Sequence, residues 1–160
     1  MKRLILMRHA QAQLEQFGKN DRDRAITMAG MHELESIRSQ LKTQLAGVEL
    51  VMCSNAKRTR QTLEGIRPLL PSTTKIDYDD DLYLASYEAL WQKVRTIPQQ
   101  YEIAMIIGHN PAVHQFAQNI SMGTNFYGFT TCSLVICEST RNHWQQMTPH
   151  AIRLSEFMKP

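Results

Sequence analysis

The chain has 160 residues, of which 42% are hydrophobic and 21% are charged, and its formal net charge is +3. A domain of this length can bury enough apolar surface to fold without disulfides or structural metals. The basic residues are scattered along the sequence, which argues against a nucleic-acid-binding surface. We therefore expect one soluble globular domain over residues 1–160.

Two features bear on the compartment. Only four apolar residues, 4–7, precede Arg8, which is too short a run for a signal peptide or a membrane span. The three cysteines, Cys53, Cys132 and Cys137, lack metal-ligand spacing, and we expect them to be buried thiols. These observations predict a cytoplasmic protein that does not contact membranes.

Strand-like and helix-like segments alternate in the first half of the chain. The apolar run 4–7 predicts a buried strand, and the helical spacing of apolar residues from Met31 to Leu45 predicts a helix with Thr27 as its N-cap. A second strand over 48–53 is followed by a second helix over 56–70. A short strand over 75–78 and a helix over 86–96 continue the alternation.

The second half predicts a strand over 103–107, then a helix that Asn110 caps and Pro111 opens. The segments 132–138 and 142–147 predict an antiparallel hairpin at the sheet edge. The whole pattern is typical of an α/β fold: a single three-layer domain with a mostly parallel central sheet and helices on both faces. Ligands of such sheets bind beyond the carboxyl ends of the strands.

Three of these strand ends carry cationic or nucleophilic side chains. Arg8 and His9 follow the first strand, Arg58 lies shortly after the second, and His109 follows the strand at 103–107. Paired arginines match the oxygens of a phosphoryl group. A neutral imidazole can attack phosphorus, and nearby arginines hold its pKa down. The pattern therefore predicts a phosphoryl-transfer crevice in which His109 donates a hydrogen bond to the transferring oxygens.

Four motifs strengthen this interpretation because they occur in order on successive elements: Leu6-Met7-Arg8-His9-Ala10, Thr27-x-x-Gly30, Ser54-x-x-x-Arg58-x-x-Gln61-Thr62 and Gly108-His109-Asn110-Pro111. Together they resemble the signature segments of the histidine phosphatase superfamily, whose fold is that of the phosphoglycerate mutases. The short length and the Arg-His-Ala opening most resemble its SixA phosphohistidine phosphatase branch. The resemblance implies that His9 is phosphorylated during turnover, that Arg8 and Arg58 clamp the phosphoryl oxygens, and that His109 is the second histidine of the pocket.

The segment 79–85 bears on the substrate. Larger, phosphoester-cleaving members of the superfamily place a general acid there, and this chain has no glutamate at the aligned position, which leaves Asp81 as the candidate acid. An alkoxide leaving group has a conjugate-acid pKa of about 15.7, whereas that of imidazole is about 6.5. A phosphoramidate needs far less help from an acid, so the sequence favours phosphohistidine as the substrate.

The chain has no room for large insertions that would close over a small metabolite, and the charged connection 11–26 suits a docking rim. We therefore expect the substrate to be a histidine-phosphorylated phosphorelay or phosphotransfer protein in signal transduction. No metal or organic cofactor is expected, and a monomer is the expected state. Two alternatives stay open: a small-molecule phosphomonoesterase that uses an aspartate of 79–81 as its acid, and a non-catalytic phosphoprotein-binding module.

Overall fold

The structure, a computed structural model, describes residues 1–121 and 128–160. Its described part contains one sheet with the strand order β3-β2-β4-β1-β5-β6. The strands are β1 (Arg3–Arg8), β2 (Leu50–Ser54), β3 (Lys75–Asp79), β4 (Ile103–Gly108), β5 (Leu134–Ser139) and β6 (Ile152–Met158). The α-helices are α1 (Met28–Leu45), α2 (Lys57–Ile66), α3 (Tyr87–Arg95) and α4 (Ala112–Ile120).

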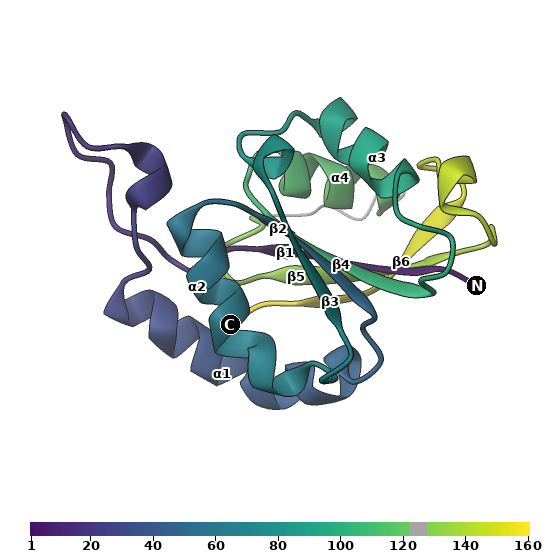
Figure 1. The fold of residues 1–160 in the computed structure, drawn as a ribbon, viewed down its shortest axis with the longest axis horizontal. Helices are drawn as coiled ribbons and strands as arrows, with labels where there is room; N and C mark the ends of the chain where they lie inside the picture. The colour runs from purple at the N-terminus through teal and green to yellow at the C-terminus, as the bar shows by residue number, and fades with distance from the viewer. Residues whose placement is uncertain (122–127) are drawn as a thin grey trace.

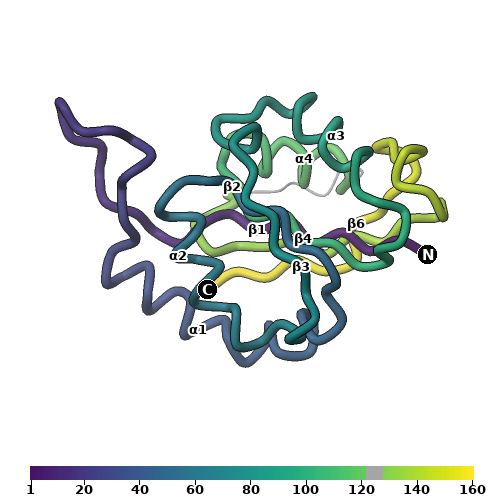
Figure 2. Tube along the Cα trace, in the orientation of Figure 1, coloured from purple at the N-terminus to yellow at the C-terminus, as the bar shows by residue number. Residues whose placement is uncertain are grey.

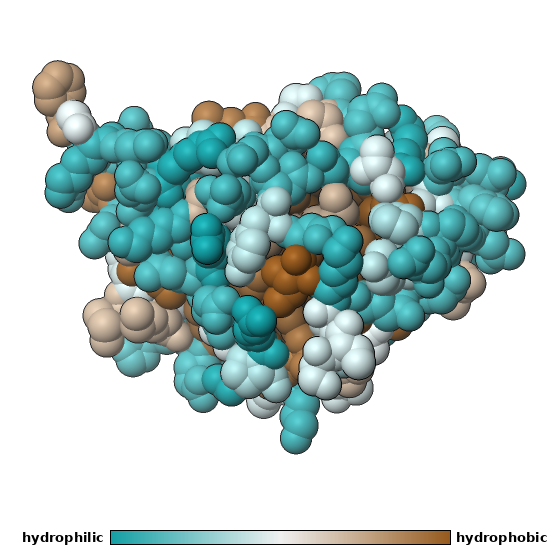
Figure 3. All heavy atoms as spheres, viewed as in Figure 1, coloured by the Kyte–Doolittle hydropathy of each residue, from teal (hydrophilic) through white to brown (hydrophobic). Residues whose placement is uncertain are grey.

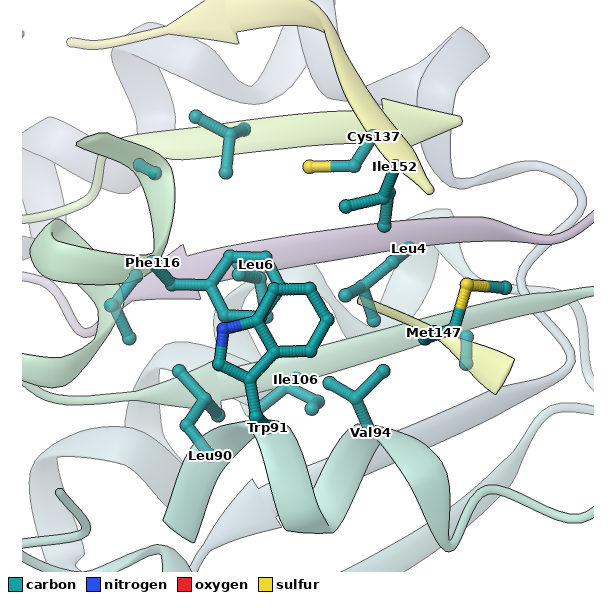
Figure 4. Packing of buried hydrophobic residues seen from close by; sticks show 14 of the residues in the cluster. Leu4, Leu6, Leu90, Trp91, Val94, Ile106, Phe116, Cys137, Met147 and Ile152 are labelled. Atoms are coloured by element: carbon teal, nitrogen blue, oxygen red, sulfur yellow. The ribbon is translucent and has the colours of Figure 1, made fainter. Parts of the chain in front are cut away.

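The fold has three layers, as the sequence predicts. Helices α1 and α2 cover one face of the sheet, and α3 and α4 cover the other (Figure 1). The α3–α4 layer packs Trp91 on Phe116 with 4.2 Å between ring centroids, directly over Leu6 and Ile106 of the sheet (Figure 4). Strands β1, β2 and β4 are buried over nearly their whole length because both of their faces are covered.

Strand direction determines where the functional residues collect. Strands β1, β2, β3 and β4 pair in parallel, whereas β5 is antiparallel to β1 and β6 is antiparallel to β5. The carboxyl ends of the four parallel strands therefore lie at one edge of the sheet, the edge from which the connection between β1 and α1 leaves the body (Figure 2). Arg8 is in register with Gly108, so the residues that follow them are neighbours.

The start of α1 explains the Thr27-x-x-Gly30 motif. The Thr27 side chain accepts a hydrogen bond from the Gly30 amide at 3.0 Å, which confirms it as the N-cap. The Thr27 amide also donates to the Gln11 carbonyl at 2.9 Å, so the helix start is joined to the chain that leaves β1. A Cβ atom on Gly30 would overlap that same carbonyl oxygen.

Two sequence predictions were wrong. The hairpin partner of β5 is β6 at Ile152–Met158 and not 142–147. Trp144 lies instead in a short 3-10 turn, fully buried, with its indole N–H donating to the Tyr101 carbonyl at 2.8 Å. Asn110 does not cap α4, because its side-chain amide donates to the Phe129 carbonyl and the N-cap position is Pro111.

A third difference is smaller. Helix α2 ends at Ile66, and a 3-10 turn over Arg67–Leu69 replaces the last turn of the helix expected to reach Leu70. Pro68 lies inside this turn, where its ring is incompatible with a continuing α-helix.

The cysteines are buried free thiols, as predicted. Burial raises the pKa of Cys53 and of Cys132 to about 12 in each case, so neither thiol is nucleophilic at neutral pH. Among the described residues, no helix combines the length and apolar character needed to cross a membrane.

Gly30→Ala should destabilise the protein, because the added methyl group forces α1 away from the Gln11 carbonyl. Overpacking of this kind costs about 2 kcal/mol in the free energy of unfolding. Urea unfolding followed by circular dichroism measures the loss. Ser39→Ala, at an exposed position of the same helix, should change the free energy by less than about 0.5 kcal/mol. Equal stability of the two variants would contradict the assigned role of Gly30.

Candidate active site

The two histidines of the motifs lie side by side at the carboxyl edge of the sheet. The β1–β4 register places His9 next to His109, with 5.2 Å between their ring centroids. Both are buried, at 8% and 6% exposure. Ser54, at the end of β2, completes the row, because its hydroxyl oxygen lies 2.7 Å from Nε2 of His109. Three separate motifs thus meet in one place.

A backbone carbonyl sets the tautomer of His9. Its Nδ1 lies 2.8 Å from the Ala10 carbonyl oxygen, which can only accept, so Nδ1 carries the hydrogen and Nε2 keeps its lone pair. Burial lowers the pKa of His9 to about 4, and the charges of Arg58 and Arg8 act in the same direction, against the opposing effect of the Ala10 hydrogen bond. His9 is therefore a neutral imidazole with a free nitrogen at physiological pH.

His109 is also neutral. Burial, followed by the proximity of His9 and of Arg58, lowers its pKa to about 3. Its Nδ1 is buried and has no hydrogen-bond partner among the described residues, although its Nε2 contacts Ser54. An imidazole nitrogen without a partner beside a second imidazole is available to a bound ligand.

Arg8 and Arg58 supply the positive charge. The Arg58 side chain is only 3% exposed, and its guanidinium donates to the Asp21 carbonyl at 2.8 Å and to the Asp21 carboxylate at 3.0 Å. Arg8 donates to the Phe129 carbonyl at 2.9 Å, and burial lowers its pKa despite the opposing charge of Glu33. The Nε atoms of both arginines lack partners within the described residues, so each retains a donor.

The remaining motif residues hold these side chains in place. Thr62 accepts a hydrogen bond from the Ala10 amide at 3.0 Å and donates to the Arg58 carbonyl at 2.7 Å, which joins the end of β1 to α2. Gln61 accepts from the Ile26 amide at 2.8 Å. The pattern Arg58-x-x-Gln61-Thr62 therefore contributes one ligand-facing cation and two residues that position the neighbouring chain.

Sequence reasoning missed the residues that surround Arg58. Asp21 was placed only in a docking rim, yet its carboxylate accepts from Arg58, from Arg24 at 2.7 Å and from the Tyr83 hydroxyl at 2.5 Å. Burial alone would raise the pKa of Asp21, but the hydrogen bonds from Tyr83 and Arg24 and the charge of Arg58 lower it to about 2. The signal available in the sequence was the charged run 21–24, whose contacts only the fold decides.

The candidate acid Asp81 is not part of this group. Its side chain is 84% exposed and pairs with Lys93 at 3.3 Å. The neighbouring Tyr83 does reach the site, with its ring edge-on to His109 at 5.7 Å between centroids. Asp81 lies inside the 3-10 turn over Asp80–Leu82 and is exposed to solvent, whereas Tyr83 follows that turn.

These side chains surround an open crevice of about 550 Å³, lined by Arg8, His9, Gln11, Ala12, Glu15, Asp21, Arg24, Arg58, Tyr83, Leu84, His109, Asn110 and Thr131. Three arginines against two carboxylates make it cationic, which suits an anionic ligand. The described residues contain no group of three or more histidine, cysteine, aspartate or glutamate side chains that could hold a metal ion. The crevice can therefore offer an anion an imidazole nitrogen and several N–H donors.

Comparison with known proteins gives the class. A family model for the histidine phosphatase superfamily, branch 1, matches residues 4–115, and the chain belongs to that superfamily. Within it, the chain falls in the SixA-like branch. Its structure matches that of the "putative phosphohistidine phosphatase SixA" of Agrobacterium tumefaciens with a TM-score of 0.82 and 25% identity, over 99% of this chain and 98% of that one.

Two further proteins are similar to this chain. The fold is shared with the protein histidine phosphatase SixA complexed with tungstate, at a TM-score of 0.78 and 20% identity over 98% of this chain and 96% of that one. An uncharacterized protein of Mycobacterium leprae is 25% identical over 150 residues, which are 88% of this chain and 89% of the relative. The family and its structural neighbours make this chain a phosphatase.

The buried histidines predict a specific pH dependence of stability. Their folded-state pKa values, about 4 and about 3, lie below the unfolded value of about 6.5. The unfolded chain therefore binds more protons, and stability is lost as the pH falls from about 6.5 toward 4. Urea midpoints across this range should decline less in His9→Gln than in the wild type. Imidazole signals of His9 that titrate near 6.5 by NMR would contradict the assignment.

Asp21→Asn should leave Arg58 and Arg24 without a compensating charge. We expect the free energy of unfolding in phosphate-free buffer to fall by about 2 kcal/mol, and inorganic phosphate to restore more stability than in the wild type, because it replaces the lost anion. Thermal unfolding with and without phosphate measures both effects. Asp23→Asn is the matched control, since Asp23 is exposed on the same turn and does not line the crevice. Identical stability and phosphate response of the two variants would contradict the inference that Asp21 stabilises the protein by pairing with Arg58 and Arg24.

Proposed function

We propose that this phosphatase hydrolyses phosphohistidine on another protein, with His9 as the nucleophile. The observation that carries the proposal is a neutral His9, whose Nε2 keeps its lone pair, in a crevice that it shares with the buried Arg58, the half-buried Arg8 and an ionised Asp21. Asp21 stays ionised at neutral pH and is engaged by Arg58, Arg24 and Tyr83. The crevice is thus equipped to receive a phosphoryl group and poorly equipped to protonate a leaving group.

The first step transfers the phosphoryl group to His9. Nε2 of His9 attacks phosphorus, and the bond from phosphorus to the substrate imidazole breaks, with its electron pair returning to that imidazole. When the other ring nitrogen of the substrate carries a proton, the leaving imidazole departs as a neutral molecule. Its conjugate-acid pKa of about 6.5 makes a separate proton donor unnecessary. Arg8 and Arg58 stabilise the charge on the transferring oxygens, and His109 does the same when its Nε2 accepts from the Ser54 hydroxyl and its Nδ1 carries the ring hydrogen.

The second step regenerates the enzyme. A water molecule attacks the phosphorus of phospho-His9, and the bond from phosphorus to Nε2 breaks with its electron pair returning to Nε2. Inorganic phosphate leaves with the water oxygen and both water protons. The hydrogen bond from Nδ1 to the Ala10 carbonyl keeps the ring orientation fixed through both steps. The same arginines neutralise the phosphoryl group throughout, so no metal ion is needed for charge compensation.

The partner follows from the shape and chemistry of the crevice. It is open to solvent and flanked by a long connection between β1 and α1 (Figure 1). A histidine-phosphorylated phosphorelay or phosphotransfer protein can place its modified side chain in such a crevice without being enclosed. The competing function within the same superfamily is hydrolysis of small phosphate esters. Ester hydrolysis needs a proton donor for the leaving group. Two carboxylates line the described crevice, and since Asp21 stays ionised, Glu15 is the one that remains for this role.

The proposal is tested with four substrates: a histidine phosphotransfer protein phosphorylated with phosphoramidate, free phosphohistidine, glucose 6-phosphate and 3-phosphoglycerate. We expect kcat/KM to be highest for the phosphoprotein, and His9→Ala to lower it at least about a thousandfold. Brief mixing followed by mass analysis should find acid-labile phosphate on His9. Faster turnover of the esters would refute the phosphohistidine assignment, and full activity of His9→Ala would refute the nucleophile.

A further inference from the structure

The connection between β1 and α1 is a projecting arm rather than a surface loop. Residues 12–26, which we name the β1–α1 arm, leave the body at the carboxyl edge of the sheet and extend away from it (Figures 1 and 2). Its base is closed by an antiparallel bridge between Ala12 and Ile26 and by a 2.8 Å hydrogen bond from the Gln13 amide to the Ala25 carbonyl.

The base of the arm forms one wall of the crevice. Ala12, Glu15, Asp21 and Arg24 all line it, and the hydrogen bonds between Asp21 and Arg58 attach the returning limb to α2. The arm is therefore held in a defined position relative to the site. Whatever carries a phosphoryl group into the crevice must pass beside it.

The tip of the arm carries two exposed apolar side chains among polar ones. Every residue from 13 to 20 is exposed, and this segment includes Leu14 at 85% and Phe17 at 108% exposure. Figure 3 shows hydrophobic atoms at the tip, standing apart from the polar surface of the body. A phenylalanine contributes more to protein association than most residues when a partner buries it, and aromatic side chains are enriched in interfaces for that reason.

A second apolar side chain lies on another loop of the same crevice. Leu84 is 69% exposed, lines the crevice and adopts a left-handed backbone conformation with φ of 54°. Leucine rarely occupies this region, because its Cβ crowds the following carbonyl. Leu84 is thus an exposed apolar group at the crevice itself, and the arm tip adds Leu14 and Phe17 outside the crevice lining.

The reach of the arm selects the size of the occupant. Phe17 lies five residues beyond the Ala12–Ile26 bridge, so it can stand up to about 18 Å from the arm's base. Leu14 and Phe17 do not line the crevice, so a small phosphate compound held next to His9 does not bury them. A folded protein that inserts a phosphohistidine into the crevice extends beyond its lining, and its surface would lie over the tip.

We infer that Leu14 and Phe17 form a docking contact for the folded protein that carries the phosphohistidine. This inference rests on the proposed function and adds to it the surface that selects a protein over a free phosphorylated compound. The tip acts on substrate capture and not on the chemical step, because neither residue lines the crevice. Its loss should therefore raise KM for the protein substrate and leave kcat intact.

The experiment compares Phe17→Ala with the wild type on the phosphorylated phosphotransfer protein and on free phosphohistidine, which have the same scissile bond. We expect KM for the phosphoprotein to rise about 10-fold, which corresponds to about 1.4 kcal/mol, with kcat unchanged. Both parameters for free phosphohistidine should stay within about 2-fold of the wild type, which also shows that the variant is folded. Leu14→Ala should shift the same parameter in the same direction.

Met28→Ala is the matched control. Met28 is 69% exposed at the start of α1 and does not line the crevice, so its truncation should change neither substrate's kinetics. An unchanged KM for the phosphoprotein in Phe17→Ala would overturn the docking contact while leaving the proposed function standing. An equal loss of kcat/KM on both substrates would also overturn the docking contact, because it would show that the arm shapes the crevice itself.

Two other outcomes are also decisive. If wild-type protein self-associates in light scattering and Phe17→Ala does not, the tip binds a second copy of this chain and the inference is wrong. If the wild type does not dephosphorylate the phosphoprotein but cleaves sugar phosphates, the proposed function fails, and the docking contact fails with it. The wild-type rates therefore separate failure of the function from failure of the contact.

Discussion

Backbone pairing between β1 and β4 places the two histidines together, and the rest of the site depends on it. Parallel strands present equivalent ends at one edge, and the Arg8–Gly108 register means that the next residue of each strand is a histidine. The pairing of β2 with β4 then brings Ser54 to Nε2 of His109. A slip of one residue would direct one imidazole to the opposite face of the sheet, since side chains alternate along a strand.

Burial of these groups determines their chemistry. Desolvation keeps both imidazoles neutral, while Arg8 and Arg58 remain charged because guanidinium does not lose its proton. The proposed nucleophile and a set of anion-binding groups therefore coexist at the same pH. Asp21 balances part of the charge in the absence of an anion, and its own hydrogen bonds orient Arg58. The proposed reactive nitrogen and the cations proposed to bind the phosphoryl group are therefore held in place by contacts within the protein itself.

Sequence predictions were correct where neighbouring residues determine the structure, and wrong where a residue far away in the sequence does. The Thr27 cap and the strands before His9 and His109 follow from neighbouring residues, and the structure confirms them. The segment 142–147 has the composition of an edge strand, yet Trp144 is buried against the carbonyl of Tyr101, more than forty residues away. Asn110 has the sequence context of a helix cap, but the Phe129 carbonyl binds its amide instead.

The sequence by itself determined the fold class, the order of the elements and four of the residues that face the crevice: Arg8, His9, Arg58 and His109. Periodicity, strand-end position and motif spacing are local properties, and they suffice for this. Only the tertiary structure decided that Asp21, Arg24 and Tyr83 join the site, that Asp81 does not, and that Phe17 is exposed at the tip of an arm. These outcomes depend on how the 11–26 connection and the turn after β3 pack near α2, which hydrogen bonds between residues far apart in the sequence determine.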